Sequence, residues 1–157
     1  MDENNRLEKI FPDYFEKFEL PSGAHEEEIK AYRACATGEC DEMSFIPSFE
    51  ENGYQYLEDD DPKDPSVYSL SLFEKPKDVK RFASMTSEFQ VPYKIALGIT
   101  ASECGLVQRT RERTRKRTSH IDWWLYLGAM PHKYFELIPD FENYLTLYTA
   151  NQTKGGI

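Results

Sequence analysis

The spacing of apolar residues divides the chain into a helical start and several short strands. From residue 2 to 19 the apolar positions recur three and four residues apart, which predicts a helical segment over 1–21, kinked or divided at Pro12. From 29 to 35 the period becomes two, which predicts a strand. Arg33 then lies on the same face as the apolar positions of that strand, where an arginine either extends to water or meets an anion.

The rest of the chain alternates irregularly between strands and helix. We predict strands over 43–49, 66–73, 93–100 and 133–138, and a helix that begins at Pro76. The acidic stretch 50–65 predicts a loop, and 151–157 is expected to fray. Since the strands and helices do not follow the regular spacing of parallel βαβ units, we predict an α+β fold. It forms one domain over 1–157 with N-terminal helices and a small mixed or mainly antiparallel sheet.

A basic segment lies within residues 101–120, whose secondary structure the sequence leaves open. As a strand it places Arg109 and Arg111 on one face, whereas as a helix it groups Arg109 with Arg113. Either geometry gives a basic ridge just before two adjacent tryptophans, which could hold phosphates while rings stack on bases. The candidate nucleic-acid or partner-binding residues are Arg109, Arg111, Arg113, Arg115, Arg117, Trp123 and Trp124.

Charge is distributed unevenly along the 157 residues, whose net charge is −9. The first 65 residues carry 19 acidic and 6 basic side chains, and the remainder carry 9 acidic and 13 basic ones. An acidic half opposes binding of nucleic acid over the whole surface, because phosphates would be repelled. It could instead dock on a basic partner, so a non-enzymatic interaction protein is the alternative function that we carry forward.

The cysteines and the N-terminus bear on the compartment. Cys35, Cys40 and Cys104 are an odd number without zinc-ligand spacing, and the first residues lack the basic and apolar regions of a signal peptide. We therefore expect free thiols, no metal and a cytoplasmic location. No apolar stretch is long enough to span a membrane, and no lipidation motif is present, so we expect no membrane association. The sequence carries no indication of oligomeric state.

Two sets of side chains could carry chemistry. Cys104, His120 and Asp122 contain the thiol, imidazole and carboxylate of a nucleophilic site. The second set consists of Arg33 on the first strand, Ser69-Leu70-Ser71 on a middle strand and Glu136 on a late strand. This order resembles the ADP-ribosyltransferase family, in which an early-strand arginine, a Ser-x-Ser strand and a late glutamate frame the NAD cleft.

The resemblance implies an NAD-dependent transferase and a role for each residue. Arg33 would pair with the pyrophosphate of NAD, and Ser69 and Ser71 would shape the cleft. Glu136 would be catalytic, holding a ribose hydroxyl and stabilising the oxocarbenium-like state as nicotinamide leaves, and His120 would orient the ribose or the acceptor. Many protein-modifying members carry Glu or Gln two residues before the catalytic glutamate. Tyr134 stands there, which favours a nucleic-acid or unusual acceptor over arginine.

Overall fold

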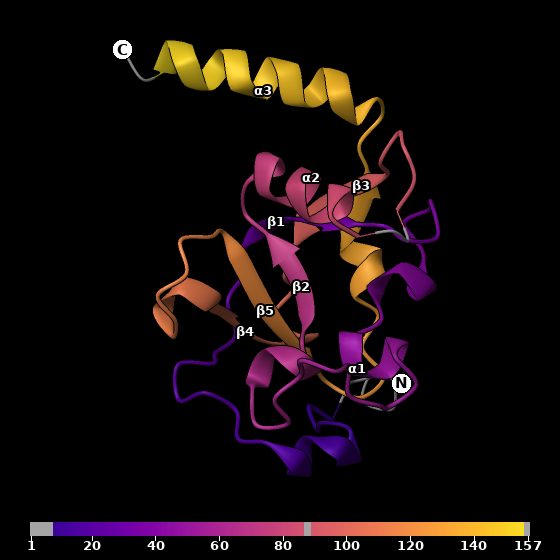
Figure 1. Cartoon of the computed structure of the whole chain (residues 1–157), viewed down its shortest axis with the longest axis vertical. Coiled ribbons are helices and arrows are strands. Elements are labelled where there is room, and N and C mark those ends of the chain that lie inside the picture. Colours follow the sequence, from indigo (N-terminus) through magenta and orange to yellow (C-terminus); the bar gives the residue numbers. More distant parts are fainter. Residues whose placement is uncertain (1–7, 87–88, 156–157) are drawn as a thin grey trace.

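Within residues 8–86 and 89–155, which the computed structural model describes, six strands form an antiparallel sheet of order β4-β5-β2-β1-β3-β6 (Figure 1). The strands are β1 (Lys30–Ala34), β2 (Leu70–Phe73), β3 (Ile95–Ile99), β4 (Gly105–Arg109), β5 (His120–Leu125) and β6 (Phe135–Leu137). The α-helices of this part of the chain are α1 (Ser48–Glu51), α2 (Pro76–Ser84) and α3 (Phe141–Gly155). The predicted α+β fold with a mainly antiparallel sheet is confirmed.

The alternation of β1 divides the core into two layers, one on each face of the sheet. Ile29, Ala31 and Cys35 belong to one buried cluster, and Tyr32 and Ala34 belong to the other. The first cluster continues through the apolar side chains of β2, β4 and β5, and the second lies beneath α2. The predicted strand over 29–35 is thus confirmed, because both of its faces find apolar partners.

Two helices cover the second face. α2 begins at Pro76, as predicted, and buries Val79 and Ala83. α3 joins the same cluster through the buried Phe141 and the partly buried Tyr144, whose hydroxyl lies 2.5 Å from the Tyr32 hydroxyl. Figure 1 shows α3 beside α2 at one end of the molecule. None of the helices in the described ranges is both long and apolar enough to cross a membrane.

The predicted N-terminal helical segment is only partly helical over the described residues. Residues 1–7 lie outside them, and the only helix between 8 and 21 is the 3-10 helix η2 (Asp13–Lys17). The aromatic side chains of this segment still meet three and four residues apart, since the ring of Phe15 contacts those of Phe11 and Phe18. Phe18 stacks on Tyr68 with ring centroids 4.2 Å apart, so the chain follows ring contacts at the end of the sheet opposite α3 (Figure 1).

Two of the predicted strands contain helical turns instead. The segment over 43–49 forms the 3-10 helix η3 (Glu42–Phe45) and the start of α1, because the Asp41 side chain accepts from the Ser44 backbone N–H at 3.0 Å and caps the first turn. The strand expected over 66–73 begins only at Leu70, because residues 65–68 form the 3-10 helix η4 (Pro65–Tyr68).

The later segments of the chain follow the predictions more closely. The strands expected over 93–100 and 133–138 are present but shorter, and the latter begins with the 3-10 helix η6 (Pro131–Tyr134). The basic segment is β4 followed by the 3-10 helix η5 (Thr110–Glu112) and a loop. α3 continues to Gly155, so the end of the chain is helical through the described residues.

β1 and β2 separate soon after they meet, and this separation places the candidate site. Their only register pair is Tyr32 opposite Phe73, whereas β1 pairs with β3 over five residues and β2 with β5 over four. Figure 1 shows β2 and β5 running together while β1 turns away from them. The residues just past the pair, Arg33 on one strand and Ser71 on the other, therefore flank a gap.

The hydroxyl contact between Tyr32 and Tyr144 gives a test of how α3 is attached. Tyr144→Phe removes the hydrogen bond but keeps the ring, so we expect the free energy of unfolding to fall by about 1 kcal/mol. Urea unfolding would measure it. Tyr148→Phe is the matched control, since Tyr148 stacks on Tyr144 one turn later. Equal losses in both variants would contradict a specific role for the Tyr144 hydroxyl.

Candidate functional site

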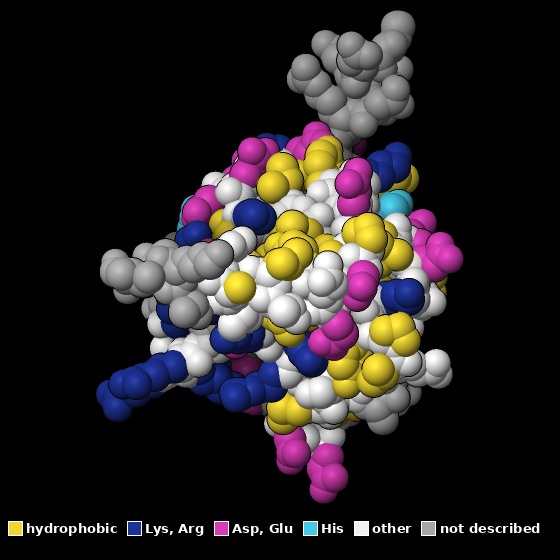
Figure 2. Space-filling model, turned by 90° about the horizontal axis from the view of Figure 1, so that it is seen from above, with side chains coloured by type: hydrophobic (Ala, Val, Ile, Leu, Met, Phe, Trp, Pro, Cys, Tyr) yellow, Lys and Arg dark blue, Asp and Glu magenta, His cyan; other side chains and the backbone are white. Residues whose placement is uncertain are grey.

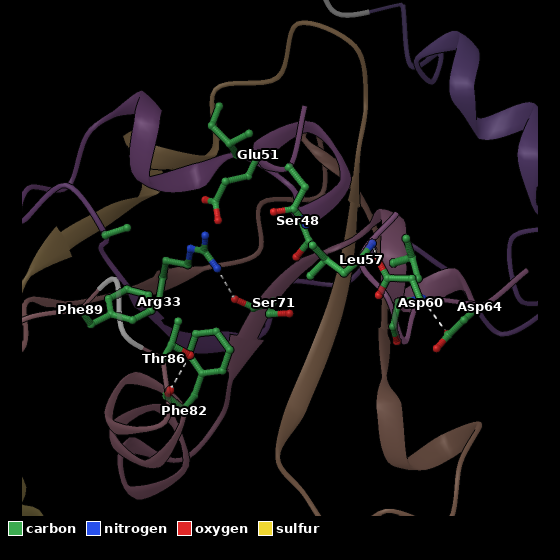
Figure 3. Close-up of a pocket in the computed structure, with 15 residues that line it drawn as sticks. Arg33, Ser48, Glu51, Leu57, Asp60, Asp64, Ser71, Phe82, Thr86 and Phe89 are labelled. Atoms are coloured by element: carbon green, nitrogen blue, oxygen red, sulfur yellow. Dashed lines mark hydrogen bonds between the residues drawn. The ribbon is translucent and has the colours of Figure 1, made fainter. Parts of the chain in front are cut away.

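A cavity of about 470 Å³ opens where β1 and β2 separate, with Arg33 and Ser71 in its wall (Figure 3). Its other walls come from α1, the acidic loop, η4, α2 and the segment after α2. The volume falls in the range of small-molecule sites, which are concave and combine apolar walls with a few placed polar groups. The cavity is therefore the first place to look for a ligand.

Arg33 supplies a fixed positive charge to this cavity. Its side chain donates from Nε to the Ser44 carbonyl and from Nη1 to the Ser71 carbonyl, both at 2.9 Å. Only 7% of the residue is exposed, and its guanidinium carbon lies 6.0 Å from the centre of the Phe45 ring. Beyond the single register pair of β1 and β2, the Ser71 carbonyl accepts from the Arg33 side chain instead of from the backbone of β1. The separation of the two strands therefore also determines where the guanidinium lies.

The other walls carry carboxylates and aromatic rings. Figure 3 shows the Glu51 carboxylate pointing toward the guanidinium of Arg33. Asp60 and Asp64 hold their own loop, since each accepts a nearby backbone N–H at 2.7 and 2.9 Å, respectively. Phe82 lies on the other side of Arg33 from Glu51, in contact with the ring of Phe89. The cavity thus combines a cation, an acid and an aromatic wall.

A buried carboxylate on β5 organises the polar groups behind Ser71. Asp122 is fully buried and lies opposite Ser71 in the sheet register. Ser69 donates to one of its oxygens at 2.7 Å, and Thr110 and Arg113 donate to the other at 2.8 Å each. Burial opposes ionisation, but the positive charge of His120, which is protonated at the acidic pH where a carboxylate titrates, and the bonds from Ser69 and Arg113 outweigh it and lower the pKa of Asp122. Asp122 is therefore ionised at neutral pH.

His120 connects this carboxylate to the cavity wall. Its Nε2 lies 2.8 Å from Ser71 Oγ, and its Nδ1 lies 2.5 Å from Thr110 Oγ1. Burial lowers the pKa of His120 below its usual value, although the Asp122 charge acts in the opposite direction. The imidazole is therefore neutral at neutral pH.

The structure brings together most of the residues of the predicted NAD site, but not all of them. Arg33 and Ser71 line the cavity, His120 touches Ser71, and Ser69 is buried behind them against Asp122. Glu136 is exposed on β6, opposite Leu97. Because β1 and β3 separate β6 from β2, the prediction that Glu136 shares a cleft with Arg33 and Ser71 is wrong.

Several arginines of the predicted basic ridge form ion pairs within the protein. Arg109 binds Glu27 and Glu74, Arg111 also binds Glu74, and Arg113 reaches the buried Asp122. The exposed arginines of the segment are Arg111, Arg115 and Arg117. Figure 2 shows Lys and Arg side chains gathered on the side of the molecule where Figure 1 places the β4–β5 connection.

Trp123 and Trp124 are both fully buried, so the prediction that their rings stack on bases is wrong. They alternate on β5 and fill the two sides of the sheet. The ring of Trp124 lies 5.7 Å from the guanidinium carbon of Arg113, and its Nε1 donates to the Pro65 carbonyl at 2.9 Å. The two tryptophans of β5 are therefore core residues.

The thiol alternative is also excluded by position. Cys104 is buried just before β4, and its carbonyl accepts a hydrogen bond from the backbone N–H of Tyr126, just after β5. His120 lies at the other end of β5, so the thiol and the imidazole are far apart. Burial raises its pKa to about 11, which leaves little thiolate at neutral pH. Over 8–86 and 89–155, no group of three or more His, Cys, Asp or Glu side chains is arranged to hold a metal ion.

Comparison with known proteins identifies no relative: no family model matches the chain, and searches of curated proteins and solved structures found no significant match. The assignment of the site therefore depends on its geometry. Sequence reasoning missed Glu51 and Thr110, which carry no local motif and reach the site only through the fold. The sequence pattern grouped Asp122 with Cys104 and His120, whereas in the structure Ser69, Thr110 and Arg113 donate hydrogen bonds to it.

The buried imidazole makes stability depend on pH. Because the pKa of His120 is lower in the folded state, the unfolded chain binds a proton first as the pH falls below about 6.5. We expect stability to fall between pH 7.5 and 5, by at most about 1.4 kcal/mol per pH unit, and the loss to level off below the folded pKa. His120→Gln should remove this component from urea-unfolding curves. An identical pH dependence in both proteins would contradict a buried neutral imidazole.

Proposed function

We propose that this protein is an NAD-dependent transferase of the ADP-ribosyltransferase type, with the cavity between β1 and β2 as its NAD cleft. The observation that carries the proposal is the meeting of Arg33 and Ser71 at the cavity wall, from two strands that separate there. These are the early-strand arginine and the Ser-x-Ser strand on which the family resemblance depends. Their convergence supports the resemblance at two of its three positions.

Binding would use the cation and the aromatic wall. A guanidinium pairs well with phosphate oxygens, and bonds to two carbonyls already fix the Arg33 side chain, so little side-chain entropy remains to be lost. Phe82 and Phe89 offer ring faces on which a base or nicotinamide can stack. The pyrophosphate would lie at Arg33, with one ring of NAD against these phenylalanines.

Catalysis requires a carboxylate near the carbon that loses nicotinamide. As the C1′–N bond breaks, positive charge develops on the ribose, and a carboxylate held in a partly enclosed site stabilises it. We assign this role to Glu51, whose carboxylate points into the cavity toward Arg33 (Figure 3). It takes the place that the sequence pattern gave to Glu136.

Binding can be tested by thermal melting with and without NAD. At 100 times its dissociation constant a ligand adds about 2.7 kcal/mol, which raises the melting temperature of a domain of this size by about 5 to 10 °C. Arg33→Lys keeps a charge but loses the planar fork, so we expect most of the rise to disappear. Phe89→Ala provides a second test if Arg33→Lys does not fold. A wild-type protein that NAD does not stabilise would count against the cleft and favour the interaction-protein alternative.

Catalysis can be tested by comparing two glutamates. Glu51→Gln should lower the rate of nicotinamide release from NAD by about 100-fold while leaving the NAD-induced melting shift in place, because a neutral amide no longer stabilises the developing charge. Glu136→Gln should release nicotinamide at the wild-type rate, since Glu136 is exposed on the far edge strand. The reverse ranking would restore the sequence-based assignment and remove Glu51 from the mechanism.

A further inference from the structure

The hydrogen bonds behind the cavity wall have a defined direction. An ionised carboxylate only accepts, so the single hydroxyl proton of Thr110 points to Asp122 at 2.8 Å. Thr110 Oγ1 must then accept from His120, which places the imidazole proton on Nδ1. Nε2 is left as an acceptor, and the Ser71 hydroxyl donates to it at 2.8 Å.

This series of hydrogen bonds has the order of a serine–histidine–carboxylate site, with Thr110 inserted between the imidazole and the carboxylate. In such sites the carboxylate end fixes the tautomer of the imidazole, and the imidazole serves as a base toward the hydroxyl. Here Thr110 transmits the influence of Asp122 to Nδ1, and Ser71 presents the other end of the chain to the cavity. A buried neutral imidazole bonded to a cavity hydroxyl is what a proton acceptor requires.

We propose that His120, acting through Ser71, takes the proton of the acceptor, and that the acceptor is therefore a hydroxyl group, either water or an alcohol. This inference rests on the proposed function, since it assumes that the cavity holds NAD. The C1′–N bond breaks and nicotinamide leaves with the bonding electrons, while a C1′–O bond forms to the acceptor. The acceptor proton passes to Ser71 Oγ as the Ser71 proton passes to His120 Nε2, so His120 ends protonated.

The charges around His120 favour a hydroxyl over a cationic acceptor. Asp122, on the same strand, is the one carboxylate acting on the imidazole and stabilises its protonated form. Arg113 and Lys116 from the following loop, together with Arg33 from β1, contribute positive charge. A guanidinium or ammonium acceptor has no free lone pair until it loses a proton, and an imidazole whose pKa lies below its usual value is too weak a base to take that proton. A neutral hydroxyl meets no such barrier, and it loses its proton readily once bonded to C1′.

Ser71→Ala and His120→Gln test the relay, with NAD as substrate and water or added methanol as acceptor. Nicotinamide release and methyl ADP-ribose formation are measured from pH 5 to 8, and the NAD-induced melting shift is measured alongside. We expect both variants to bind NAD but to react about 100-fold more slowly. Wild-type activity should fall as the pH drops through the pKa of His120, below its usual value, and His120→Gln should lose this acidic limb.

Two further variants separate a proton-transfer role from a structural one. Ser71→Thr keeps a hydroxyl and should recover most of the rate that Ser71→Ala loses. His25→Gln removes an exposed histidine whose contacts are to Gly23 and Glu27, and it should keep both the wild-type rate and the acidic limb. An acidic limb that persists in His120→Gln would overturn the relay.

The outcomes distinguish this inference from the proposed function. If wild-type protein cleaves NAD and Glu51→Gln does not, but Ser71→Ala and His120→Gln react at the wild-type rate, the relay alone is overturned. If wild-type protein is neither stabilised by NAD nor cleaves it, the proposed function fails and the relay falls with it. Slow reaction with intact NAD binding in both relay variants, together with recovery in Ser71→Thr, supports the relay.

Discussion

Burying an ionised carboxylate costs free energy unless hydrogen bonds and an opposite charge replace its hydration. Asp122 is fully buried, and the contacts that stabilise its charge hold several parts of this structure together. Ser69 immediately precedes β2, Thr110 begins η5 directly after β4, and Arg113 directly follows η5. One buried charge therefore joins β5 and the turn after β4 to the residue before β2, which is distant from both in sequence. Removing one partner of such a group typically costs about 3 to 5 kcal/mol, so the segments are held together strongly.

The same network determines what can happen at the cavity. Asp122 and Thr110 fix the His120 tautomer, and that tautomer fixes the direction of the Ser71 hydroxyl. On the other side of the gap, Arg33 bonds to the Ser71 carbonyl, where strand pairing between β1 and β2 has ended. Ser71 is thus held from both sides, by its backbone and by its side chain, and it joins the Arg33 guanidinium to the His120 imidazole.

The proposed NAD chemistry depends on how these parts divide the work. Arg33 and the phenylalanines of α2 and its following segment would bind and orient, Glu51 would stabilise developing charge, and the relay would remove a proton. Each role matches a property of the group: a guanidinium fixed by two hydrogen bonds, a cavity-facing carboxylate and an imidazole whose pKa burial holds below its usual value. The basic segment takes no part in binding NAD in this scheme, because Arg109, Arg111 and Arg113 are already bound in ion pairs.

The sequence alone determined the α+β class, the alternation of β1 that divides the core, the helix that begins at Pro76, and the candidacy of Arg33, Ser71 and His120. These depend on periodicity and side-chain chemistry, which are local. Tertiary structure decided which acid faces Arg33, because strand order places Glu136 at an edge and the fold brings Glu51, which no sequence pattern singled out, to the cavity. It also decided that the tryptophans are core and that the N-terminal aromatic residues pack ring on ring. Such contacts join residues that local spacing does not relate.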